Sequence, residues 1–214
     1  MADQVTLPLF PLPLVVFPGE PLPLHIFEER YKALITWCLE GERLGEQRRF
    51  GVSKVTDEGL AAVGCAVVIE QVRQRYPDGR YDIITVGQQR YELLSAVRER
   101  VWPEGEIRWF DDDPDDTDQT LIDRTVALHT RLIELVRGEP PRYSYAGLRD
   151  LAFVLGHEAG LDVGERQRLL ELRTERARLA ALVTYYEGIL PRLAEREDVA
   201  RRIRSNGHIP RGLA

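Results

Sequence analysis

The sequence predicts an α+β fold: a small, partly open β-barrel with one inserted helix, followed by a helical bundle. Short apolar runs broken by Pro and Gly fill the first half, as expected of strands joined by tight turns. Helical spacing of apolar residues dominates the second half. Between them lie six aspartates in eight residues. We therefore expect a barrel over residues 1–110, an acidic linker over 111–118 and a helical bundle over 119–214.

The first expected strands are proline-rich. Residues 7–12, Leu-Pro-Leu-Phe-Pro-Leu, should be extended, because proline fixes its own φ and keeps the preceding residue out of the helical region. Residues 22–27 should be extended again after a turn at Pro18-Gly19. Proline cannot donate a backbone hydrogen bond, so we expect these runs at sheet edges or bulges.

One helix should interrupt the barrel between Glu28 and Glu40. There the apolar residues recur three and four positions apart, as on one face of an amphipathic helix: Tyr31, Leu34, Ile35, Cys38 and Leu39. Gly41 is the expected C-terminal stop, since glycine readily adopts the left-handed conformation that ends a helix.

The clearest hairpin joins residues 65–69 to residues 81–86. Its turn, Pro77-Asp78-Gly79, combines a proline that presets φ with a glycine that accepts positive φ. Short strands at 49–52, 91–97 and 106–110 complete the set, with a further turn at Pro103-Glu104-Gly105. Six or so short strands with one helix favour a small barrel.

Helical spacing resumes after the acidic segment. A first helix should run from about residue 119 to Gly138, and a second should cover residues 144–159 and end at Gly160. Aspartates before the first of these helices suit the positive end of its dipole.

Two more helices follow, each with its own start signal. Asp162 and Glu165 have the spacing of a capping box before a short helix. Thr174 is placed to cap a longer helix, which Pro191 should kink or end. We expect the tail, residues 201–214, to fray.

Composition favours a cytoplasmic protein with neither a membrane nor a nucleic-acid partner. Cys38 and Cys65 form no CxxC pair, so we expect two buried thiols in a reducing compartment. The N-terminal apolar stretch is too rich in proline for a signal peptide or a membrane helix. The net charge is −6, and only residues 119–214 carry more basic than acidic groups, which disfavours nucleic acid as a partner.

The familiar catalytic and metal-binding motifs are missing from the sequence. It contains no GxxxxGK[ST] loop, no GxSxG elbow and no GxGxxG fingerprint. His157-Glu158 begins like HExxH, but Leu161 stands where the second histidine belongs. The aspartate run has Asp116 and Ile122 where a calcium loop needs Gly and Glu. We therefore expect no metal and no cofactor.

An ordered set of motifs in the first ninety or so residues carries a family resemblance. The set comprises residues 7–12, Phe17-Pro18-Gly19, residues 22–28, Arg30-Tyr31, Phe50-Gly51-Val52, Gly64-Cys65, Asp78-Gly79-Arg80, and Gly87 followed by Arg90-Tyr91. In this order it resembles the N-terminal domain of Lon proteases. From Thr117 onward the resemblance is looser and rests mainly on a leucine-rich helical arrangement.

This resemblance implies a fold and a role. The fold is a PUA-like pseudo-barrel followed by a helical bundle. In Lon proteases the region helps to capture unfolded or tagged substrates and supports assembly, and cereblon contains a related domain. We therefore expect a non-catalytic polypeptide-recognition module, such as an adaptor or regulator in protein quality control. ATPase or Ser–Lys protease activity is not expected, because the sequence has no Walker A motif and no lysine after Lys54.

The candidate binding residues are aromatic and charged side chains in and after the proline-rich runs: Phe10, Phe17, His25, Phe27, Glu28, Arg30 and Arg90. The aromatic ones could equally belong to the core. An extended or unfolded polypeptide, or a protein partner, could add as a strand to the proline-rich edge, with pockets giving selectivity. The oligomeric state stays open, with a dimer as one option.

Three alternatives remain open at this point. An RNA-binding barrel would need its arginines to gather on one face: Arg48, Arg49, Arg73, Arg75, Arg80 and Arg90. A pocket for a small ligand would fit the cereblon relationship. The least favoured alternative is an enzyme that uses His25 and Glu28 with an arginine.

Overall fold

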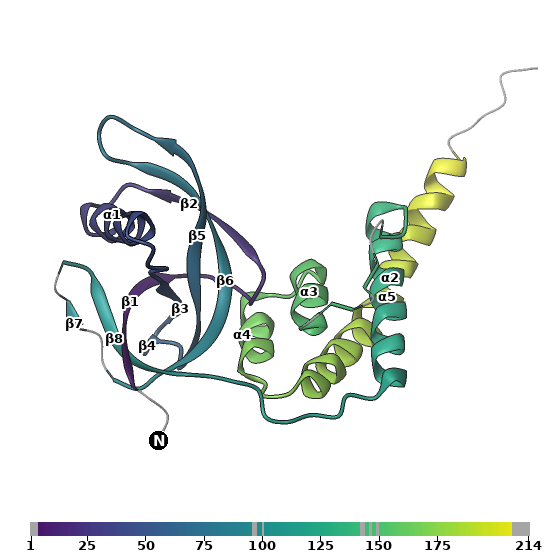
Figure 1. Ribbon diagram of the computed structural model, residues 1–214. Helices are drawn as coiled ribbons and strands as arrows, with labels where there is room; N and C mark the ends of the chain where they lie inside the picture. Colours follow the sequence, from purple (N-terminus) through teal and green to yellow (C-terminus); the bar gives the residue numbers. More distant parts are fainter. Residues whose placement is uncertain are drawn as a thin grey trace, which may run out of the picture.

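The protein has two parts that pack side by side, a β-barrel from the first half of the chain and a group of helices from the second (Figure 1). The structure is a computed structural model that describes residues 4–95, 98–99, 101–141, 144–145, 147–148 and 150–206. Helix α1 (Glu29–Arg43) lies on the side of the barrel that faces away from the other helices. This arrangement confirms the expected α+β fold of a barrel with one inserted helix and a C-terminal helical part.

Five strands close the barrel. In order around the ring they are β6 (Tyr81–Leu93), β5 (Val63–Arg75), β3 (Phe50–Thr56), β1 (Val5–Leu12) and β8 (Pro103–Trp109), and β8 pairs back with β6. Three shorter strands extend the sheet: β2 (Pro21–Ile26) on β6, β4 (Gly59–Leu60) on β3 and β7 (Arg98–Glu99) on β8.

The hairpin predicted around Pro77-Asp78-Gly79 is confirmed and is longer than expected. Gly79 has a φ of 84°, as its place in the turn requires, and Tyr76 N–H donates to the Arg80 carbonyl at 2.9 Å. The two predicted strands at 81–86 and 91–97 are one continuous strand, β6, as far as Leu93. Residues 96 and 97 lie outside the described part of the chain.

The turn predicted at Pro103-Glu104-Gly105 is wrong, because these residues begin strand β8. Gly105 pairs with Leu7 of β1, in the barrel wall. A Cβ at Gly105 would lie 2.6 Å from Leu93 Cδ1 and 2.9 Å from Leu9 Cδ1. The glycine therefore serves close side-chain packing and not a change of chain direction.

The proline-rich strands have different positions in the sheet. β2, with Pro21 and Pro23, lies at the sheet edge, as predicted. β1 lies inside the ring, contrary to prediction. Its first half, residues 5–8, pairs with β8, and its second half, residues 9–12, pairs with β3. Each half of β1 therefore has one side without a ladder, and this allows proline inside the barrel.

Helix α1 continues past Gly41, so the stop predicted there is wrong. Gly45, with a φ of 78°, follows the true end of the helix, and Glu46 N–H donates to the Gly41 carbonyl at 2.9 Å. A Cβ at Gly41 would lie 2.5 Å from the Arg48 side chain. That arginine donates to the Trp37 carbonyl at 3.0 Å, so Gly41 makes room for a returning side chain.

The helical part contains α2 (Gln119–Arg137), α3 (Leu151–Glu158), α4 (Val163–Glu171) and α5 (Glu175–Asn206). α2 ends at Gly138, which has a φ of 78°, as predicted. The helix predicted over 144–159 is regular only from Leu151, and residues 142, 143, 146 and 149 are outside the described part. The core of this half also contains Phe17 from the barrel side.

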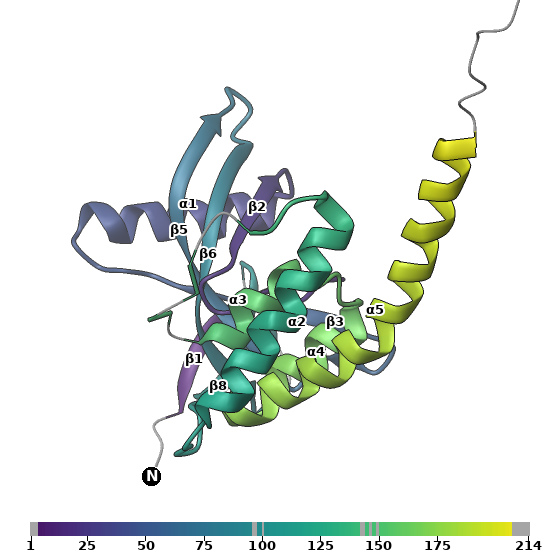
Figure 2. The ribbon, with the colours of Figure 1, turned by 90° about the vertical axis from the view of Figure 1, so that its right-hand side faces the viewer.

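The helix caps predicted at Asp162 and Thr174 are confirmed. Asp162 and Glu165 form a reciprocal capping box, each side chain accepting the other residue's N–H at 2.8 Å. Thr174 Oγ1 accepts from Ala177 N–H at 3.1 Å. Helix α5 continues through Pro191, so the proline does not end it, and Figure 2 shows a bend along this helix. Of the tail expected to fray, residues 201–206 are helical and residues 207–214 are outside the described part.

Candidate binding site

A groove of about 630 Å³ opens where the ends of several barrel elements meet the start of α1. Five of the seven candidate residues from the sequence line it, and two, Phe17 and Arg90, lie elsewhere. The complete lining is Phe10, Pro11, Leu12, Leu24, His25, Phe27, Glu28, Arg30, Tyr31, Val55, Gly59, Leu60 and Pro103. Most of these side chains are apolar, with a few polar groups, which is the usual make-up of a binding site.

Strand alternation explains why Phe27 faces solvent. Ile26 is 1% exposed and points into the barrel core, so its neighbour Phe27 points outward, and Phe27 is 61% exposed. Phe27 is the first residue after β2, and Glu28 is the residue before α1, where its carbonyl accepts from Lys32 N–H at 2.9 Å. The junction between strand and helix thus holds a large apolar side chain in water at the groove.

The floor of the groove is aromatic and fixed. The ring of Phe10 stacks on that of Tyr31 with 4.0 Å between centroids, and both residues are nearly buried. Phe10 also packs against Phe50 in the barrel core. Phe10 is therefore a core residue with one face toward the groove, as the sequence left open.

One end of the groove carries a histidine–carboxylate pair. His25 Nδ1 lies 2.5 Å from Asp82 Oδ1, and Tyr76 donates from its hydroxyl to Asp82 Oδ2 at 2.7 Å. The hydrogen bonds from His25 and Tyr76 hold the pKa of Asp82 below its usual value, and the bond to Asp82 raises the pKa of Tyr76. Sequence reasoning missed Asp82, because it comes from β6, 57 residues after its partner.

The polar side chains of the groove are few and paired with their neighbours. The lining, as far as the structure describes it, contains no Ser, Thr, Cys or Lys that could act as a nucleophile. Glu28 accepts from Arg30 Nε at 3.0 Å, and the Arg30 guanidinium lies 4.7 Å from the centre of the Tyr31 ring. The polar groups of the groove are therefore already engaged with one another and frame an apolar surface.

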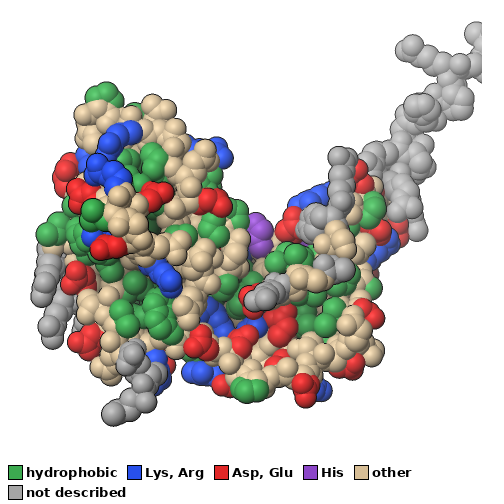
Figure 3. All heavy atoms as spheres, in the orientation of Figure 1, with side chains coloured by type: hydrophobic (Ala, Val, Ile, Leu, Met, Phe, Trp, Pro, Cys, Tyr) green, Lys and Arg blue, Asp and Glu red, His purple; other side chains and the backbone are tan. Residues whose placement is uncertain are grey.

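Phe17 lies between the barrel and the helices and not in the groove. It is fully buried, stacks on Phe153 of α3 at 5.2 Å, and has the Arg166 guanidinium 4.2 Å from its centre. The surface between the two parts of the molecule is hollowed (Figure 3), but Phe17 contributes no exposed area to any surface. A partner could contact this ring only if the two parts separated.

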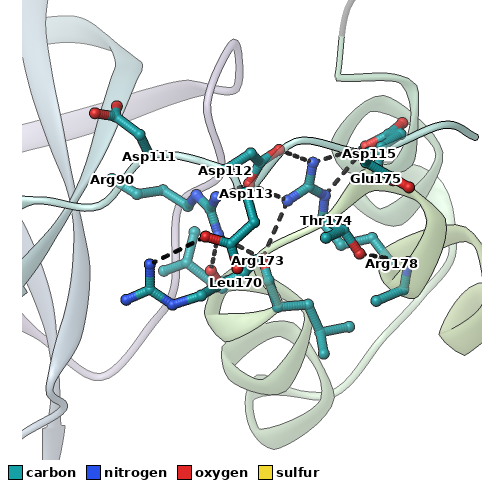
Figure 4. A network of polar contacts seen from close by, with 12 residues as sticks. Arg90, Asp111, Asp112, Asp113, Asp115, Leu170, Arg173, Thr174, Glu175 and Arg178 are labelled. Atoms are coloured by element: carbon teal, nitrogen blue, oxygen red, sulfur yellow. Dashed lines mark hydrogen bonds and ion pairs between the residues drawn. The ribbon is translucent and has the colours of Figure 1, made fainter.

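Arg90 also belongs to the contact between barrel and helices. It is 4% exposed and donates from Nη1 to the carbonyls of Leu170 and Leu172 at 2.6 and 2.7 Å. Its other amino group bonds to Asp112. Figure 4 shows Arg90 and Arg178 meeting at this aspartate from opposite sides.

The acidic segment is therefore more than a solvated linker. Asp112 accepts from fully buried Arg178 at 2.8 and 2.5 Å, Asp113 N–H donates to the Arg173 carbonyl at 2.9 Å, and Asp115 accepts from Arg176 N–H at 2.6 Å. The run joins the two parts of the molecule by specific contacts. The sequence shows a run of aspartates but does not show which of them form hydrogen bonds to the helical part.

The arginines that an RNA-binding face would need are dispersed among separate contacts. Arg90 is buried, Arg48 pairs with Glu46 at 2.7 Å and stacks on Trp37, and Arg80 pairs with Asp78 at 2.7 Å. These three cations are thus already neutralised or covered, which leaves less positive field for a phosphate backbone.

Residues 6–186 match the model of the ATP-dependent protease La (LON) substrate-binding domain family. The chain belongs to this family. The match spans the barrel and most of the helical part, and it includes every residue of the groove.

Two solved structures of Lon N-terminal domains share the fold. A Lon N-terminal domain protein from Xanthomonas campestris is 28% identical, with a TM-score of 0.63 over 85% of this chain and 98% of that one. The N-terminal domain of the Mycobacterium avium complex Lon protease is 16% identical, with a TM-score of 0.60 over 86% of this chain and 98% of that one. Both structural matches extend over the barrel and part of the helical half.

Three further features of this Lon-family chain concern metals, membrane helices and thiols. Within the described ranges, no three or more His, Cys, Asp and Glu side chains are grouped so that they could hold a metal. No helix in the described part combines the length and apolar character that a membrane crossing requires. Cys38 and Cys65 are both buried free thiols, and burial raises the pKa of each to about 12, so they remain protonated at neutral pH.

Proposed function

We propose that this chain is a non-catalytic polypeptide-recognition module that binds unfolded or extended segments of other proteins in the cytoplasm, as an adaptor or regulator in protein quality control. The observation that carries the proposal is the groove, where Phe27 stands 61% exposed beside the rigid floor of Phe10 and Tyr31. Exposure of a large apolar side chain to water raises the free energy of the unbound protein. A partner that covers the side chain removes this cost.

The family supports the same reading, since the domain it describes is named for substrate binding. The candidate residues have distinct roles in the proposed binding of polypeptide. Phe27 is the exposed anchor, Phe10 and Tyr31 form the floor, and His25, Glu28 and Arg30 are the polar rim that orients a ligand. Phe17 and Arg90 act in holding the two parts of the molecule together and contact no ligand.

The test is a titration with a permanently unfolded protein, reduced and carboxymethylated lactalbumin, followed by fluorescence anisotropy. We expect saturable binding by the native, monodisperse chain. Phe27→Ala should weaken it by about 30-fold, because truncating an anchoring aromatic residue costs on the order of 2 kcal/mol. Val136→Ala is the matched control, since Val136 is 64% exposed on α2 but outside the groove.

Equal binding by the two variants would remove the groove from the proposal, and no saturable binding by the native chain would remove the proposal itself. RNA is the alternative partner in the same assay. A steeply salt-dependent RNA affinity, with no binding of unfolded protein, would replace polypeptide recognition by RNA recognition.

A further inference from the structure

The outer edge of β2 borders the groove, and its backbone direction follows from the pairing with β6. Gly87 N–H donates to the Glu20 carbonyl at 3.0 Å, so the backbone of Glu20 turns toward β6. Backbone groups of successive residues in a strand point to opposite sides, so Leu22 faces β6 as well. Its carbonyl accepts from Thr85 Oγ1 at 3.0 Å, which agrees with that direction.

The alternate residues of β2 consequently face the free edge, and most of them lack a donor. These are Pro21, Pro23 and His25, of which only His25 has a backbone N–H. The opposite wall of the groove contains Pro11 of β1 and Pro103 of β8, which also lack this group. Proline at such positions prevents a continuous ladder with an added strand. The strand addition considered from the sequence is therefore disfavoured here.

The charges around the groove are predominantly negative. Of the charged residues here, only Glu28 and Arg30 line the groove, and they are paired with each other at 3.0 Å. The segments around the lining, residues 10–12, 24–32, 54–60 and 103–104, carry five carboxylates, Glu28, Glu29, Asp57, Glu58 and Glu104, against three basic side chains, Arg30, Lys32 and Lys54. Lys32 is paired with Glu29, so Asp57, Glu58 and Glu104 make up the acidic rim of the groove. The proline carbonyls at the free edge add hydrogen-bond acceptors without matching donors. A partner that complements this rim brings positive charge and side-chain donors.

We infer that the groove selects extended segments in which a bulky apolar side chain is flanked by Lys or Arg, and that it recognises side chains and not the backbone ladder. The inference rests on the proposed function and specifies its ligand. The apolar side chain packs between Phe27 and the floor of Phe10 and Tyr31, while the flanking cations meet the acidic rim. Backbone N–H groups of the ligand are not needed, so segments that contain proline remain acceptable ligands.

The backbone part is tested with two fluorescent peptides of identical side chains, one of them N-methylated at alternate backbone nitrogens. Side-chain recognition predicts affinities within about threefold of each other, since no ladder hydrogen bond is lost. A loss of tenfold or more on methylation would overturn the inference in favour of strand addition. Replacing the apolar residues of the peptide by serine should remove binding in either case, which confirms that the peptides occupy an apolar site.

The charge part is tested with the same apolar peptide flanked by lysines or by glutamates. We expect the lysine peptide to bind about tenfold more tightly at 50 mM salt and about twofold more tightly at 500 mM, because salt screens exposed charges. The double variant Asp57→Asn with Glu58→Gln should reduce the preference by about threefold. Asp123→Asn with Glu134→Gln on α2 removes equal charge away from the groove and should leave the preference unchanged.

The outcomes separate this inference from the proposed function. If both peptides bind equally and Phe27→Ala abolishes binding, the groove recognises polypeptides but without charge selection, and the inference fails. If neither peptide binds and Phe27→Ala leaves the binding of unfolded protein intact, the assignment of the groove fails as well. A glutamate peptide that binds more tightly than the lysine peptide contradicts the inference directly.

Discussion

At the scale of single residues, close contacts in the barrel explain why Gly51 and Gly64 are glycines. In the sequence they stood out only as members of the motifs that resemble the family. Tyr91 is fully buried, its hydroxyl lies 2.5 Å from Ser53 Oγ, and burial raises the pKa of this tyrosine, so the hydroxyl stays protonated. Gly51 and Gly64 lie directly against its ring. The barrel interior can hold a tyrosine at this position because two neighbouring residues have no side chain.

Gly64→Ala should destabilise the protein by about 2–3 kcal/mol. The added methyl group would overlap the Tyr91 hydroxyl and lie 2.7 Å from the Val52 carbonyl oxygen, and a backbone atom cannot move aside cheaply. Urea denaturation measures the effect. Gly188→Ala on α5 is the matched control, because nothing lies within 4 Å of its Cβ position and alanine favours the helix by up to about 1 kcal/mol. An unchanged midpoint for Gly64→Ala would contradict the packing described.

At the scale of elements, a buried histidine links three helices. His129 of α2 is fully buried, its Nδ1 lies 3.0 Å from the Tyr186 hydroxyl of α5, and its Nε2 lies 3.7 Å from Glu158 of α3. Burial lowers the pKa of His129, and nearby Glu158 opposes this shift only in part. The helices therefore pack around a neutral imidazole.

This arrangement predicts a stability that falls on mild acidification. The unfolded chain binds a proton at His129 near pH 6.5 and the folded chain only at lower pH, so stability is complete above 6.5 and decreases below it. The slope from one proton is at most about 1.4 kcal/mol per pH unit. Denaturation at pH 7.5 and 5.5 should show a smaller decrease for His129→Gln than for the native chain, and equal decreases would exclude the histidine as the cause.

At the scale of the whole molecule, the acidic segment fixes the barrel to the helices. Arg90 from β6 and Arg178 from α5 are 4% and 0% exposed, and both bond to Asp112. Arg178 is also paired with Glu175 at 2.9 Å. Burial lowers the pKa of Arg178, but the bonds to Asp112 and Glu175 outweigh it and raise the value. Two cations from different parts of the molecule thus share one carboxylate.

Asp112→Ala should destabilise the protein by about 3 kcal/mol or more, because it leaves two buried guanidinium groups without their shared partner. Thermal or urea unfolding measures the loss, and separate transitions for barrel and helices would show that their contact is what was weakened. Asp116→Ala, an exposed neighbour in the same acidic run, serves as the control and should change stability by less than about 0.5 kcal/mol. Equal effects of the two substitutions would contradict the role of Asp112.

The sequence by itself determined the order of the elements, the hairpin turn, the helix caps and the family, and it named five of the residues that line the groove. These features depend on local backbone preferences and on the spacing of neighbouring residues, as at Asp162 and Glu165 or at Gly79. The outward direction of the Phe27 side chain follows from the same kind of local rule, because side chains alternate along the chain and Ile26, its neighbour, is buried.

Only the tertiary structure decided which side chains meet across long stretches of chain. Phe17 and Arg90 had the composition of binding residues, yet their partners, Phe153 and Asp112, come from other elements, and these contacts bury them. Asp82 likewise reaches His25 from a distant strand. Periodicity shows which face of an element is apolar but not which element covers it, because burial and charge pairing are set by packing between elements.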